Sequence, residues 1–193
     1  AGAIRDSLME VPEEHRRAHK HGTGREHRHA GLAQTLWLDP RLAMRQAESI
    51  RDAISRARPD RKIVFAENFE KLKTDLESLG TNLPEATVPL LASHPVYQYL
   101  QRRFDLNLKS VHWEPGDLPP VTEWKDLKKM LEKHPAQWML WEGEPLPATA
   151  KKLRELGIEP IVFDPCGNVP DEGDYLTVMR ANFANLKKAL SKR

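Results

Sequence analysis

The spacing of apolar positions along the chain changes near residue 80. Between about residue 39 and residue 80, apolar side chains recur every three or four residues, which is typical of one face of a helix. One helix is predicted to begin at Asp39 and Pro40, because Asp is a good N-cap and Pro suits the first turn. A second is predicted between Pro59 and Gly80. The expected buried faces are Ala43, Ala47, Ile50 and Ile54 in the first helix and Phe65, Phe69, Leu72, Leu76 and Leu79 in the second.

After Gly80, short apolar runs alternate with helical patterns. The candidate strands are 87–93, 109–113, 137–141 and 160–163, and the candidate helices are 94–104, 122–134, 146–157 and 174–190. Thr122 is expected to cap the helix 122–134. Strands that alternate with crossover helices indicate a parallel sheet. The fold class is therefore α/β, with a four-stranded, mostly parallel sheet flanked by helices and preceded by two long helices.

The first 31 residues have no apolar period and are rich in charge, which predicts a flexible segment. Five of the eight histidines fall here, at His15, His19, His21, His27 and His29. We expect three parts: the flexible segment 1–31, linking helices 32–80 and an α/β unit 81–193. Tracts of this kind bind zinc or copper loosely, and the alternative is a solvated basic loop.

Composition narrows the function classes. A net charge of +2 over 193 residues gives no overall electrostatic footprint for nucleic acid, so none is expected as a partner. The single cysteine, Cys166, excludes a disulfide framework and a cysteine-rich zinc site. No apolar run approaches the length of a membrane span.

Each predicted strand is followed by a potential metal ligand or acid–base group: His94, Glu114, Glu142 and Asp164. Ligands of open parallel sheets bind at the carboxyl ends of the strands. One imidazole with carboxylates suits zinc or manganese. Polar residues are also common where loops begin, so ordinary turn residues remain the alternative.

The segment SHPVYQYLQRRFDL around His94 resembles the ligand-bearing segment of the zinc and manganese solute-binding proteins of bacterial ABC importers. Further segments are similar to that family in the same order, from about Leu36 to Leu190. They are LWLDPRLAMRQAESI, VFAENFEKLKTDLESLG, VHWEPG, the Trp141–Glu142 strand end and FDPCGN with the helix after it.

The resemblance implies metal ligands at His94 and Asp164, with Glu142 in support. It also implies a two-lobed protein, and almost all of the first lobe would lie before Ala1. The family carries a ligand His four residues before its Asp-Pro pair, where this chain has Thr35. Thr is a poor zinc ligand, so we expect an incomplete or altered site.

The expected function is that of a non-enzymatic solute-binding protein for zinc or manganese. By resemblance its partners are the ion and an ABC permease, and its place is the periplasm or the outer face of the membrane. The His-rich residues His15 to His29 would gather metal. Two alternatives remain: a metal-dependent hydrolase that uses the strand-end His and carboxylates, and an interaction domain that binds no metal.

Overall fold

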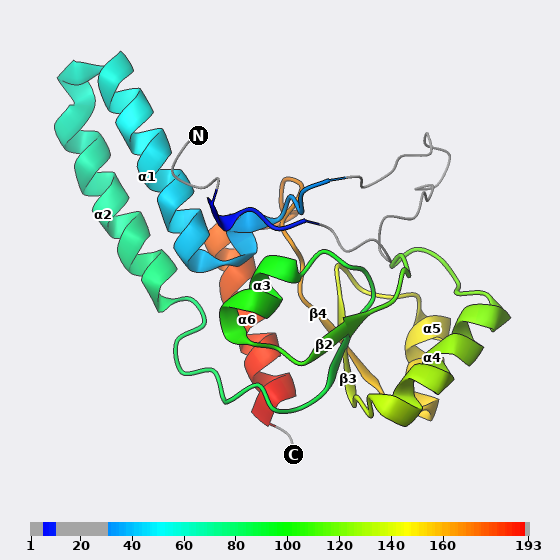
Figure 1. Ribbon diagram of the computed structural model, residues 1–193. Helices are drawn as coiled ribbons and strands as arrows, with labels where there is room; N and C mark the ends of the chain where they lie inside the picture. The colour runs from blue at the N-terminus through cyan, green and yellow to red at the C-terminus, as the bar shows by residue number, and fades with distance from the viewer. Residues whose placement is uncertain (1–5, 11–30, 192–193) are drawn as a thin grey trace.

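The computed structural model describes residues 6–10 and 31–191. Two long helices come first and strands then alternate with helices, as the apolar pattern predicts (Figure 1). The helices are α1 (Pro40–Ala57), α2 (Lys62–Ser78), α3 (Gln98–Phe104), α4 (Val121–Lys133), α5 (Pro147–Glu155) and α6 (Tyr175–Ser191), with the short 3-10 helices η3 (Leu36–Leu38) and η4 (Pro59–Arg61). The strands are β1 (Leu90–Ala92), β2 (Leu108–Ser110), β3 (Trp138–Trp141) and β4 (Glu159–Val162).

All four strands run parallel, in the order β2-β1-β3-β4. The predicted fold class is confirmed. Leu91 pairs with Met139 in the centre of the sheet, and Leu140 pairs with Ile161 on its far side. After β1 the chain forms β2 on one side of β1, and it later forms β3 on the other side of β1. The sheet therefore has its topological switch point between β1 and β3.

Two apolar layers cover the two faces of the sheet. On one face Leu90, Ala92 and Leu140 pack in a cluster with α6, which contributes Met179 and Leu186. On the other face Leu91, Met139 and Trp141 pack with residues of α4 and α5, namely Trp124, Leu127 and Leu153. Helices on both faces explain why β1 and β3 are buried along their whole length.

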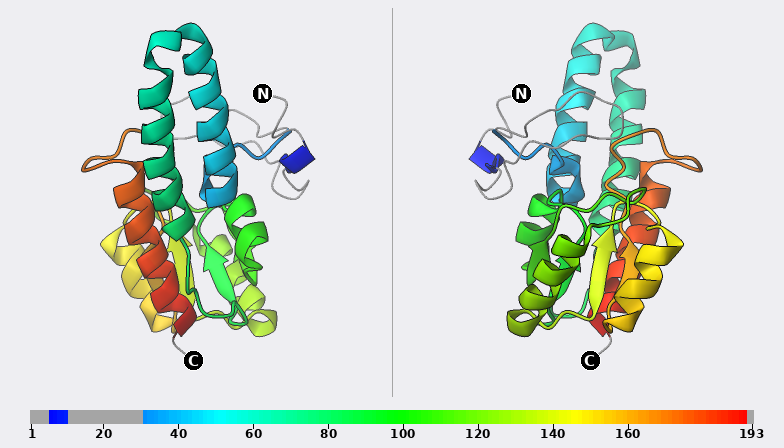
Figure 2. Two further views of the ribbon diagram at one scale, coloured as in Figure 1. Left: turned by 90° about the vertical axis from the view of Figure 1, so that its left-hand side faces the viewer. Right: turned by 90° about the vertical axis from the view of Figure 1, so that its right-hand side faces the viewer.

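The hairpin of α1 and α2 stands out from this three-layered body (Figures 1 and 2). Asp39 accepts a hydrogen bond from the Arg41 N–H at 2.9 Å, which confirms the predicted N-cap. The predicted burial of this helix is wrong in its outer half, because Ile50 is 61% exposed and Ile54 is 39% exposed. Ile63 and Val64 of α2 are also exposed. The two outer halves contact each other, and no third layer covers them among the residues that the structure describes.

Two predicted boundaries are also corrected. Helix α4 begins at Val121 with Pro120 as its N-cap residue, so Thr122 lies inside the first turn and makes no cap. Helix α3 begins only at Gln98. Pro95 disfavours a helical conformation at the residue before it, and a turn closed by the Val96 N–H on the His94 carbonyl takes the place of a first helical turn. His94 therefore lies on a turn and not on a helix.

The residues on either side of segment 11–30 pair with each other. Glu10 and Leu32 form an antiparallel bridge, and the Ala33 N–H donates to the Met9 carbonyl at 2.8 Å. Tyr99 of α3 fixes this pair, since its hydroxyl accepts from the Met9 N–H and donates to the Ala33 carbonyl. The five His-rich residues themselves lie outside the described residues. Among the helices that are described, none is both long and apolar enough to cross a bilayer.

Candidate metal site at the strand ends

His94 lies at the switch point of the sheet, two residues beyond β1. The backbone of the preceding residue, Ser93, is bonded to both neighbouring strands: its N–H donates to the Leu140 carbonyl of β3, and its carbonyl accepts from the Trp113 N–H beyond β2. The His94 side chain is 7% exposed. The imidazole is therefore held in a fixed place between the ends of three strands.

Two carboxylates flank this imidazole from opposite sides. Nδ1 of His94 lies 3.2 Å from Oε1 of Glu142, which directly follows β3. Nε2 lies 3.6 Å from Oε1 of Glu114, which follows β2. Both carboxylates are about one quarter exposed, so they line an opening to solvent. The structure thus brings together three of the four strand-end residues that the sequence singled out.

Asp164 occupies the corresponding place after β4. Its Oδ1 accepts the Cys166 N–H at 2.7 Å, so part of its capacity serves the turn that the sequence offered as an alternative. Asn182 of α6 clasps the Asp164 backbone, accepting from its N–H at 3.0 Å and donating to its carbonyl at 2.6 Å.

Tyr97 is hydrogen-bonded to the residue that precedes Asp164. Its hydroxyl donates to the Phe163 carbonyl at 2.7 Å, and its side chain is 1% exposed. Burial raises the pKa of Tyr97 well above its ordinary value, and the negative charges of Glu142 and Asp164 raise it further. The phenol therefore stays neutral beside a patch of negative potential, the kind of potential that favours a cation.

Thr35 lies against the same turn. Its hydroxyl donates to the Val96 carbonyl at 2.5 Å, two residues from His94. Trp37, on the adjoining η3, donates its indole N–H to the Pro165 carbonyl at 2.7 Å. Thr35, which stands where the family has a ligand His, is thus next to the strand ends. Its hydroxyl is already hydrogen-bonded to a backbone carbonyl.

One nearby imidazole was missed by the sequence analysis. His112 stands edge-on to His94, with ring centroids 5.5 Å apart and planes at 87°. The triplet His112-Trp113-Glu114 could have indicated it, because two polar side chains flank an apolar one and should lie on the same side of an extended chain. Within residues 6–10 and 31–191, no three His, Cys, Asp or Glu side chains already converge in an arrangement that could hold a metal ion.

A family model described as the periplasmic zinc-uptake complex component A, ZnuA, matches residues 3–189. That is nearly the whole chain. The chain belongs to this family. The resemblance seen in the sequence is thereby confirmed.

Curated proteins similar to this chain are named as zinc-binding proteins. The zinc-binding lipoprotein AdcA of Streptococcus pneumoniae R6 is 26% identical over 180 residues, and the zinc-binding protein AdcA of a serotype M3 Streptococcus pyogenes is 28% identical over 189 residues. These alignments cover 87% and 91% of this chain. The chain spans only about 36% of the length of either relative.

Solved structures share the fold. The zinc-bound ZnuA-like domain of Streptococcus pneumoniae AdcA superposes with a TM-score of 0.74 at 24% identity, covering 83% of this chain and 65% of that one. The metal-dependent lipoprotein YcdH of Bacillus subtilis superposes with a TM-score of 0.72 at 21% identity, covering 82% and 65%. At this identity the likeness establishes the fold and leaves the ligands to be argued from this chain's own residues.

Proposed function

We propose that this chain is the ion-holding part of a zinc solute-binding protein that serves an ABC importer, with an altered metal site. The observation that carries the proposal is the buried His94 imidazole at the switch point of a ZnuA-family sheet, flanked by Glu142 and Glu114. Family membership favours an uptake component over the hydrolase alternative. We infer that the chain binds its ion without chemical turnover.

His94 is the ligand on which the proposed site depends. Asp164 and Glu142 are the carboxylates proposed to join it, as the sequence suggested. Zinc is the proposed ion because imidazole with carboxylates is a common zinc donor set and the related proteins are named for zinc. Manganese, with its preference for oxygen ligands, is expected to bind more weakly to a site centred on an imidazole.

We further propose that the protein works outside the cytoplasmic membrane, in the periplasm or anchored to the outer face. Its partner there would be an ABC permease that receives the ion. The periplasmic family description and the lipoprotein relatives support this proposal. The loop histidines, His15 to His29, would gather metal, as histidine-rich tracts of this composition do.

The proposal is tested by zinc-dependent melting of the full chain in which His15, His19, His21, His27 and His29 are replaced by Ala. Zinc at one hundred times its Kd should stabilise the folded state by about 2.7 kcal/mol. For a chain of this size that raises Tm by roughly 5–10 °C. His94→Ala should abolish the zinc-dependent rise.

The matched control is His134→Gln, because His134 is a buried imidazole at the amino end of β1, whereas His94 follows its carboxyl end. Nε2 of His134 lies 2.8 Å from the Leu90 carbonyl at the start of β1. His134→Gln should lower Tm with and without zinc by the same amount. A zinc-dependent rise that survives in His94→Ala would refute a site centred on His94.

A further inference from the structure

A pocket of about 320 Å³ opens on the β2 side of His94. Its polar walls come from the end of β1, from the loop between β2 and α4 and from the first turn of α4, and they consist of His94, His112, Glu114, Asp117 and Glu123. This pocket lies away from Asp164, which follows the strand at the other edge of the sheet. It therefore offers His94 a second set of donors, beside the one that the sequence suggested.

The backbone that carries two of these donors is firmly fixed. Trp113 is 3% exposed, and its ring packs against Trp124 and Trp141 at centroid distances of 4.6 Å and 6.3 Å. Its N–H donates to the Ser93 carbonyl at 2.6 Å, and the Val111 N–H donates to the Ala92 carbonyl. The chain beyond β2 thus stays bonded to β1 up to the residue before His94.

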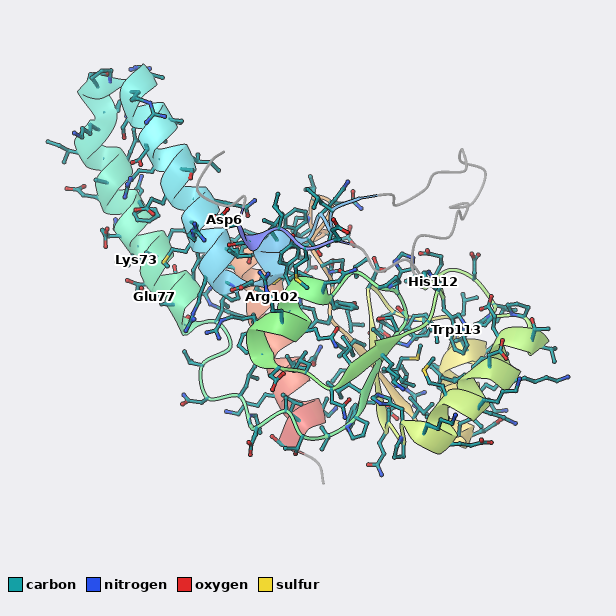
Figure 3. All side chains as sticks on the ribbon, in the orientation of Figure 1. Asp6, Lys73, Glu77, Arg102, His112 and Trp113 are labelled. Carbon is teal, nitrogen blue, oxygen red and sulfur yellow. The ribbon has the colours of Figure 1, made fainter. Side chains whose placement is uncertain are left out.

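His112 and Glu114 flank this anchored tryptophan. Successive side chains of an extended segment point to opposite sides, so both should point away from the core that Trp113 enters. Both line the pocket, as expected. Figure 3 labels His112 and Trp113 where the chain leaves β2, on the side of the molecule that carries α4.

The His94 imidazole is oriented for a ligand on this side. A histidine that binds metal through one ring nitrogen usually donates its other N–H to a carboxylate or a carbonyl. Glu142, 3.2 Å from Nδ1, can accept that N–H. Nε2 then faces Glu114 at 3.6 Å, with the His112 ring edge-on nearby.

We propose that His94, His112 and Glu114 are zinc ligands of this chain, and that His112 supplies the imidazole that Thr35 does not. The inference rests on the proposed function and keeps His94 as its central ligand. It replaces Asp164 and Glu142 with His112 and Glu114 as the partners of His94, and Glu142 then accepts the other N–H of the imidazole. Zinc–nitrogen bonds are about 2.0–2.1 Å long, so His112 and Glu114 must rotate about their side-chain bonds to close on the ion. Both are partly exposed at the wall of the pocket, and their backbone need not move.

Zinc affinity measured by competition with a chromophoric chelator tests this assignment. The parent is the full chain with the five loop histidines replaced by Ala. His112→Ala and Glu114→Gln should each weaken zinc binding by at least about tenfold, the loss that even an outer partner of a metal ligand produces. Asp117→Asn is the matched control, because Asp117 lines the same pocket and is not a proposed ligand; it should leave the Kd unchanged.

The outcomes separate the inference from the function on which it rests. If His94→Ala abolishes zinc binding while His112→Ala leaves the Kd unchanged, His112 is not a ligand and the proposed function stands. If the parent binds no zinc, or binds it as well after His94→Ala, both are overturned. Circular dichroism without metal checks folding, and His112→Gln is judged by the same criterion if His112→Ala does not fold.

Discussion

Two glycines with left-handed backbone show how differently single positions constrain this chain. Gly80, at the end of α2, has φ +69, and an added Cβ would lie 2.5 Å from Cζ of Phe104 and 3.0 Å from Cε1 of Phe183. Gly157, after α5, has φ +78, but nothing lies within 4 Å of an added Cβ. Gly80 therefore serves both the backbone turn and the packing of two aromatic rings.

We expect Gly80→Ala to destabilise the protein more than Gly157→Ala. The left-handed conformation alone costs an L-residue about 1–2 kcal/mol, which is the expected loss at Gly157. Overpacking at Gly80 adds roughly 1–3 kcal/mol. Urea unfolding of both variants measures the difference, and equal losses would show that the rings of Phe104 and Phe183 move aside without cost.

Three residues of the candidate site could be predicted from the sequence, and a fourth could not. His94, Glu114 and Glu142 were found because each follows a predicted strand, and parallel strands end at one edge. His112 was overlooked because it lies inside the run KSVHW, which was expected to be strand throughout. The strand ends at Ser110, so His112 belongs to the loop and faces His94.

The α1–α2 hairpin shows the limit of apolar spacing as a guide to burial. The spacing correctly predicted both helices, because it reflects a shared face. It could not say whether a third layer covers that face. At the base of the hairpin Leu76 is 2% exposed and packs with α6, whereas Ile63 near the tip is 75% exposed.

Truncation of these two side chains should therefore have unequal effects. Leu76→Ala should lower the free energy of unfolding by about 2–5 kcal/mol, because it leaves a cavity in the main core. Ile63→Ala should change it by no more than about 0.5 kcal/mol. Chemical denaturation of both variants checks this, and a large loss at Ile63 would mean that the tip is covered in solution.

Stability of the molecule as a whole should fall above pH 10. Burial raises the pKa of Tyr97 and of Tyr175 above their ordinary value of 10.0. The unfolded chain therefore loses these protons first as pH rises, and it binds fewer protons than the folded chain above pH 10. By linkage, the free energy of unfolding then decreases with pH.

Tyr97→Phe isolates the contribution of that residue. It removes a buried hydrogen bond to the Phe163 carbonyl, which should cost about 0.5–1.5 kcal/mol near neutral pH. It should also make the decline above pH 10 shallower than in the parent. Unfolding curves between pH 8 and pH 11 measure both effects, and an unchanged slope would show that Tyr97 does not titrate on unfolding.

At this scale the sequence was a good guide to architecture and a partial guide to the site. The parallel sheet followed from strands alternating with helices, a pattern that leaves few topologies. The metal ligands could not be settled in the same way, because they depend on side-chain directions at loop residues. The division into parts at residues 31 and 80 stays a prediction.

The protruding hairpin has the geometry of a lever arm. Its pivot lies beside the strand ends, where Tyr175 and Trp37 are joined by a hydrogen bond and Trp37 is bonded to the Pro165 carbonyl. Helix α2 has 17 residues. At 1.5 Å per residue the arm is therefore about 25 Å long, and a tilt of about 5° at the pivot would swing its tip through about 2 Å. A small tilt at the strand ends would thus give a larger displacement at the far end of the arm.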